Sequence, residues 1–213
     1  VWREPGAIHL GADIETTGGG AAIEVRESAV TLNTDVRLVT NDGPITLDEI
    51  LDDGNDRTLT IDTGTADVTV DDNVGDAGLP RVPLHALVID RAGTVHFSSF
   101  AATVDIGTLT IGYSARVTDV IFDGAVTVDD HVDIITGAIT LNGTLDAVGT
   151  VAIAHTGQAT INADIVLLTL GEEGMALQTA DGRSLLLPSS KGSGVADPTG
   201  AGDTVAASMT AAL

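Results

Sequence analysis

The sequence predicts a mainly β protein: a parallel β-helix, or solenoid, over residues 1–163, followed by a small α/β fragment over residues 164–213. A five-residue unit, glycine-x-apolar-x-apolar, recurs through residues 1–163 and predicts a turn followed by a short alternating strand. No ten-residue stretch of that region has helical periodicity. Aromatic residues make up 2% of the chain against 43% hydrophobic residues, so the core must consist of small aliphatic side chains stacked in ladders.

The glycine units follow one another along the chain. They are Gly6 to Leu10, Gly43 to Leu47, Gly93 to Phe97, Gly107 to Ile111, Gly124 to Val128, Gly137 to Leu141 and Gly149 to Ile153. From Gly93 onward they start 14, 17, 13 and 12 residues apart, with further short strands between them. Units of this kind predict coils that each pair with the next one. Because the spacing has no strict period, a β-sandwich or β-roll stays open as the alternative.

The C-terminal segment has a different order of elements. An apolar strand ends in a glycine-bounded acidic turn within Val166 to Met175, and Ala176 to Pro188 predicts a hairpin with an Asp-Gly turn. A glycine-rich turn, Asp197 to Thr204, then precedes an apolar helix over Val205 to Met209. The predicted order is strand, turn, hairpin, loop, glycine-rich turn and helix.

The glycine-rich turn has the residues that phosphoryl transfer needs. Glycines allow backbone N–H groups to surround an anion at a helix N-terminus, and Asp203 is placed to accept the proton of a substrate hydroxyl. The alternative is a turn that caps the helix and has no chemistry.

These two motifs carry a resemblance. Residues from about 165 to 213 resemble the ribokinase (PfkB) carbohydrate kinases, and most closely the kinase half of heptose-7-phosphate kinase/adenylyltransferase enzymes. The resemblance implies that Gly200, Ala201 and Gly202 form the anion hole, that Asp203 is the catalytic base, and that Thr169 and Gly171 line the nucleotide site. It also implies ATP and Mg²⁺, and a sugar or sugar phosphate as substrate. In the family, the sugar pocket and the Mg²⁺ site come from a larger N-terminal portion, so activity of this chain as a kinase stays open.

The pattern of short glycine-bounded strands in residues 1–163 resembles the β-helical repeats of bacterial surface proteins of the filamentous-haemagglutinin type. Two functions follow as alternatives. In one, the chain carries the ATP-site and catalytic-base segment of a carbohydrate kinase without being active by itself. In the other, it is a structural or adhesin-like protein whose tail is a cap or a fusion remnant. The first implies a cytoplasmic location, and the second implies a secreted or cell-surface one.

Composition narrows the possible partners. The chain has 31 acidic and 9 basic residues, a net charge of −22. Nucleic acid is disfavoured, because its phosphates would be repelled. No stretch predicts a transmembrane span, there is no cysteine, and unpaired sheet edges predict possible self-association. The chain opens at Val1 and ends in an apolar helix pattern, so we expect a piece of a longer or assembled protein.

Metal sites are weakly indicated. Asp52 to Asp56 and Asp71 to Asp76 cluster oxygen ligands that could take Ca²⁺, but neither has the spacing of a calcium loop. Within Asp129 to Asp133, His131 and Asp133 could share one face of a strand, but a single coil gives too few ligands. Solvated turn residues are the favoured interpretation, and no metal ligand is assigned.

Overall fold

The computed structural model describes residues 8–26, 30–75, 84–98, 104–147, 150–161, 165–169, 174–179 and 184–188. The chain separates into two compact units, Val1–Asn162 and Ala163–Leu213. The first is a parallel β-solenoid of about six turns, which confirms the predicted fold over the sandwich or roll. The described residues of both units lie in strands and connecting turns, and no helix long and apolar enough to cross a membrane occurs among them.

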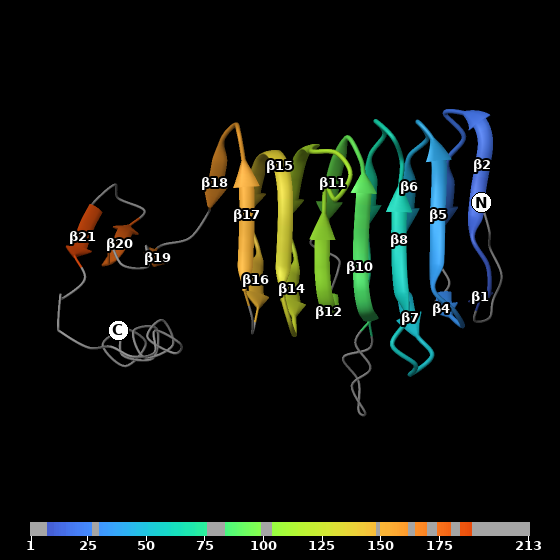
Figure 1. Cartoon of the computed structure of the whole chain (residues 1–213), viewed down its shortest axis with the longest axis horizontal. Coiled ribbons are helices and arrows are strands. Elements are labelled where there is room, and N and C mark those ends of the chain that lie inside the picture. Colours follow the sequence, from blue (N-terminus) through green and yellow to red (C-terminus); the bar gives the residue numbers. More distant parts are fainter. Residues whose placement is uncertain are drawn as a thin grey trace. The chain divides into compact units, whose positions relative to one another are not determined.

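The strands of successive coils stack into parallel ladders, and neighbouring arrows point the same way (Figure 1). One ladder contains β2 (Ile14–Gly19), β5 (Val36–Asn41), β8 (Thr58–Asp62), β10 (Leu84–Arg91), β12 (Val104–Ile111), the first half of β15 (Val132–Leu141) and β17 (Val151–His155). Another contains β3 (Ile23–Val25), β6 (Ile45–Leu47), β9 (Val68–Val70), β11 (Thr94–Phe97), β13 (Val117–Phe122), the second half of β15 and β18 (Ala159–Ile161). We call these the long ladder and the corner ladder.

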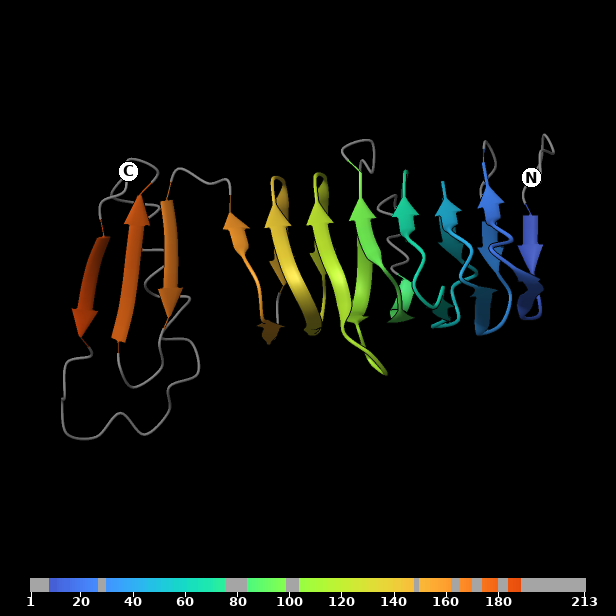
Figure 2. The same cartoon turned by 90° about the horizontal axis from the view of Figure 1, so that it is seen from above.

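A third side of the solenoid has two runs of paired strands. The first run is β1 (Ile8–Leu10), β4 (Val30–Leu32) and β7 (Ile50–Asp52), and the second is the start of β12 with β14 (Ala125–Val128) and β16 (Thr144–Ala147). The view from above shows the coils succeeding one another along a single axis (Figure 2). The apolar part of each of the seven glycine units lies in a strand, as the sequence predicts, but Gly107 and Gly137 lie within β12 and β15 and not in the predicted turns.

Coil length varies, which explains the missing period. Val132 pairs with Val151, 19 positions later, whereas Leu59 pairs with Leu87, 28 positions later. The pairing fixes only the strands, so the corner loops absorb the difference. A search for a constant repeat length therefore cannot find this solenoid.

The interior is filled by the inward residue of each alternating strand. In β5 and β9 these side chains are buried while their neighbours are half-buried or exposed. Small aliphatic residues dominate, as composition predicts, and two aromatic rings are added: Phe97 and Phe122 stack with ring centroids 4.9 Å apart and planes 2° from parallel. Both are fully buried, while Phe100 lies outside the described residues.

Glycine is required at corners where coils approach closely. A Cβ at Gly93 would meet the carbonyl oxygen of Thr65 in the preceding coil, and a Cβ at Gly137 would meet that of Thr118. Any larger residue there must push two coils apart. Gly93 therefore allows close backbone contact at a bend, and Gly137 allows it within β15.

The described part of the second unit is a three-stranded antiparallel sheet. It consists of β19 (Ile165–Thr169), β20 (Gly174–Thr179) and β21 (Ser184–Pro188) in that order. The pairing of β20 with β21 confirms the predicted hairpin strands. The predicted glycine-rich turn and its helix lie outside the described residues.

Candidate functional site

The structure places one of the residues that the kinase resemblance assigns. Thr169 is the last residue of β19 and pairs with Met175 of β20. Gly171 falls between these strands and lies outside the described residues, as do Gly200, Ala201, Gly202 and Asp203. Their roles stay predictions.

A buried carboxylate, Asp62, is the centre of a polar cluster in the solenoid. Asp62, at the end of β8, has a side chain only 2% exposed, and it receives Arg91 Nη2 at 2.8 Å and Arg91 Nε at 3.1 Å. Arg37 of the preceding coil donates to the same carboxylate at 3.1 Å, and the Gly64 N–H donates at 3.2 Å. Asp62 thus joins three successive coils at one corner.

The pKa of Asp62 reflects two opposed effects. Burial by itself would raise the pKa, but the hydrogen bonds from Arg91 and Gly64 and the charges of Arg91 and Arg37 outweigh burial and hold it below 3.8. The same contact raises the pKa of Arg91. The cluster is therefore ionised at neutral pH, and it has a structural role because each carboxylate oxygen is already bonded.

A second cluster follows the corner ladder. His96 Nε2 lies 2.8 Å from Asp123 Oδ2, and Asn142 Nδ2 donates to Asp123 Oδ1 at 2.6 Å. The hydrogen bond from Asn142 and then that from His96 lower the pKa of Asp123. Sequence reasoning missed this cluster, although a signal was present: a polar residue directly follows each strand of this ladder, as in Phe122-Asp123 and Leu141-Asn142.

The acidic loops use their oxygens internally. Asp52 accepts backbone N–H groups of Gly54, Asn55 and Arg57 at 2.8 to 3.1 Å. Asp53 pairs with the Arg57 guanidinium at 2.9 Å, and these hydrogen bonds hold the pKa of Asp53 well below its usual range. These contacts support the interpretation as turn residues.

The other acidic stretches give similar local contacts. Asp72 accepts the Asn73 N–H at 2.8 Å, and His131 Nδ1 lies 3.3 Å from Asp130. Across the described ranges, no group of three or more His, Cys, Asp or Glu side chains is arranged to hold a metal ion. We therefore assign neither the Mg²⁺ that the kinase resemblance implies nor Ca²⁺ to these residues.

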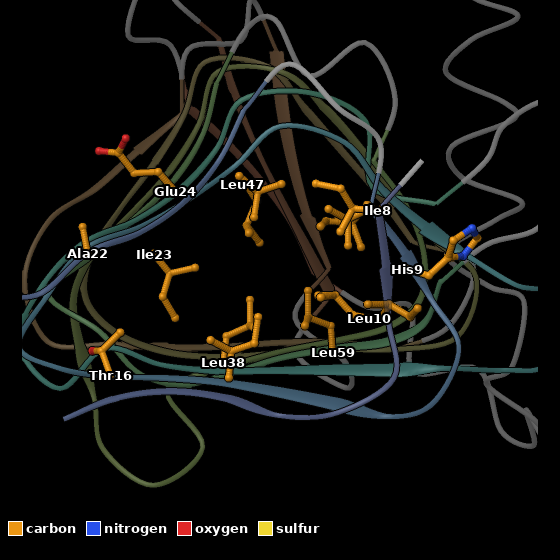
Figure 3. A pocket seen from close by; sticks show the side chains of 15 residues that line it. Ile8, His9, Leu10, Thr16, Ala22, Ile23, Glu24, Leu38, Leu47 and Leu59 are labelled. Atoms are coloured by element: carbon orange, nitrogen blue, oxygen red, sulfur yellow. The ribbon is translucent and has the colours of Figure 1, made fainter. Parts of the chain in front are cut away.

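An apolar recess of ≈ 310 Å³ lies at the β1 end of the solenoid (Figure 3). Leu10, Ile23, Leu38 and other inward residues of the first coils line it. Its titratable neighbours, His9 and Glu24, point away from it (Figure 3). The recess is lined by core side chains of the first described coils and offers packing without acid-base chemistry.

Comparison with known proteins adds one finding. Residues 138–213 match the family model of the pfkB family carbohydrate kinases. No curated protein and no solved structure matches the chain. The match confirms the carbohydrate-kinase resemblance of the C-terminal segment, and it begins earlier than residue 165, within β15. The last strands of the solenoid, β16 to β18, therefore lie inside the matched range.

Proposed function

We propose that the chain is a β-solenoid that carries the nucleotide-binding and catalytic-base segment of a carbohydrate kinase. The family match over residues 138–213, which contains Asp197 to Thr204, is the observation that carries the proposal. Phosphoryl transfer depends mainly on positioning and on charge stabilisation, so backbone donors and one carboxylate supply much of the machinery. The reaction would move the γ-phosphoryl of ATP to a hydroxyl of a sugar. The resemblance to heptose-7-phosphate kinases suggests a heptose phosphate as the sugar.

The proposed roles follow the motif. The N–H groups of Gly200, Ala201 and Gly202 hold the developing negative charge, and Asp203 accepts the proton of the attacking hydroxyl. Thr169 and Gly171 border the nucleotide. Mg²⁺ would neutralise phosphate charge when bound, and we derive no step through it.

We propose that this chain binds nucleotide without turning it over. The resemblance implies that the sugar pocket comes from an N-terminal portion of the kinase domain, whereas the described residues between 8 and 161 lie in solenoid coils, and catalysis requires the sugar hydroxyl in line with the γ-phosphoryl. Turnover would need a sugar pocket in addition to these residues.

Calorimetric titration with ATP and Mg²⁺, followed by a phosphorylation assay on sugars and sugar phosphates, tests the proposal. We expect saturable binding of ATP that Gly202→Val abolishes and Asp203→Asn keeps, because the glycine approaches phosphate whereas the base acts only in the chemical step. Gly194→Val, outside the motif, is the matched control. Absence of nucleotide binding would overturn the proposal.

The second candidate function is structural, an adhesin-like solenoid exposed outside the cell. The continuous ladders from β2 to β17 favour it, because they form a repetitive acidic surface that needs no catalytic group. The melting temperature in the presence of ATP and Mg²⁺ separates the two functions: an unchanged value supports the structural one. The predicted self-association through sheet edges stays a prediction under both.

A further inference from the structure

An open groove of ≈ 380 Å³ lies on the outer face of the long ladder. Its floor is a row of outward residues in register, in which Arg37 pairs with Thr60, Thr60 with Val88, and Val88 with Thr110. In each strand the flanking residues are buried, so these side chains face outward. The volume falls in the range of about 300–1,000 Å³ that small-molecule sites occupy.

The wall of the groove is the loop after β12, and backbone contacts fix its position. The Gly112 N–H donates to the Ile89 carbonyl at 2.8 Å, and the Ser114 N–H donates to Asp90 Oδ1 at 2.9 Å. Gly112 has a φ of 80°, a conformation that a side chain disfavours. These bonds hold the intervening Tyr113 on the groove with 75% of its surface exposed.

The charges of the groove balance one another. Arg37 already donates to Asp62 and lies 3.8 Å from Asp90, so its positive charge is compensated. An anionic ligand would gain little from it and would be repelled by a chain of net charge −22. What remains are groups that suit a neutral polyol: an exposed aromatic ring, the hydroxyls of Thr60 and Thr110, and a half-exposed guanidinium beside a carboxylate.

We propose that this groove binds a neutral carbohydrate chain. The Tyr113 ring packs against the apolar C–H face of one pyranose, while Arg37 and Asp90 bond its hydroxyls. Because backbone hydrogen bonds hold the residues on both sides of Tyr113, the loop need not rearrange when a ligand binds. The site uses solenoid residues only and does not depend on the proposed kinase function.

The chain contains a single tyrosine, which gives a specific probe. In the full chain with ¹³C-labelled tyrosine, cellohexaose or maltohexaose should shift the ring signals of Tyr113 saturably, whereas polygalacturonate should not. Calorimetry should show an affinity loss of at least about tenfold for Tyr113→Ala and a smaller loss for Thr110→Val. Tyr113→Phe should keep most of the affinity, because the ring stays.

Thr140→Val, on the corner ladder, is the matched control and should keep full affinity. Far-UV circular dichroism checks that each variant is folded, and Tyr113 is exposed enough that its removal leaves the core intact. The proposal is overturned if neither hexaose shifts the ring signals, if only polygalacturonate does, or if Tyr113→Ala binds as tightly as the parent chain.

Discussion

The middle coils and the last coil of the solenoid share a strand pattern but differ in burial. Along one inward column of the long ladder, Leu59, Leu87 and Leu109 are 0% exposed, whereas Val151, in register with them, is 47% exposed. A β-branched apolar residue at the inward position is therefore not enough to make a core. Among the described strands, β17 pairs only with β15, whereas β8, β10 and β12 each have a ladder partner on both sides, which accounts for the difference at this position.

The largest loss of stability is expected when an aromatic ring is removed from a middle coil. Phe122→Ala should lower the free energy of unfolding by about 3–5 kcal/mol, because it leaves a cavity opposite Phe97 that the stacked coils cannot close. Val151→Ala in the last coil should cost about 0.5 kcal/mol or less. Urea denaturation measures both, and equal losses would contradict the difference between the coils.

The second prediction concerns the close approach of neighbouring coils at Gly93. Gly93→Ala should cost about 1–3 kcal/mol, because its Cβ would meet the Thr65 carbonyl oxygen and the Asp67 carboxylate. Gly11→Ala is the matched control: a Cβ there meets nothing within 4 Å, so the change should be neutral or slightly stabilising. Thermal unfolding compares the two variants, and a neutral Gly93→Ala would show that the coils can separate without cost.

The buried carboxylate should make the middle coils sensitive to acid. The folded pKa of Asp62 lies below its ordinary value of 3.8, so its stabilisation is present above about pH 4 and is lost as the pH falls through the folded pKa. Asp62→Asn should cost about 1–3 kcal/mol at pH 7 and should flatten the loss of stability as the pH falls below about 4.

Asp133→Asn, which changes an exposed carboxylate in the same ladder, is the control for this experiment. Urea unfolding at several pH values gives both curves. If Asp62→Asn left the acid part of the stability curve unchanged, so that the free energy of unfolding still fell with pH as in the parent chain, the carboxylate would not be a source of the stability of these coils.

A smaller effect concerns the last coil. Arg116 Nη1 donates to Thr156 Oγ1 at 2.9 Å on the exposed surface, linking residues 40 positions apart. Arg116→Ala should cost about 0.5 kcal/mol or less, because both groups can bond to water instead. Amide hydrogen exchange of β17 and β18 measures it, and a large increase in exchange would show that this bond holds the coil.

The smallest expected effect is that of calcium. The Asp52 and Asp53 oxygens are bonded within their own loop, so Ca²⁺ should leave the melting temperature unchanged in calorimetry. A rise that EDTA reverses would reveal a site that the turn contacts conceal.

The strands were predictable from sequence because each glycine unit combines a turn with local alternation, as at Gly43 to Leu47. The coil pairing was not, because the distance from one strand to its partner changes with every corner loop. The Asp62 cluster joins residues 25 and 29 positions apart, and only the pairing register brings them together. The kinase motif was found through its glycine spacing, which is a local signal, whereas its geometry falls outside the described residues.

The parallel register makes the outside of the solenoid a molecular ruler. Neighbouring strands lie about 4.8 Å apart, so the row from Arg37 through Thr60, Val88 and Thr110 to Asp133 marks points over roughly 19 Å. Substituted cysteines along this row would fix pairs of probes at evenly graded separations. The protein lacks cysteine, so a pair of introduced thiols would meet no competing native thiol, and the distance between their probes could be assigned without ambiguity.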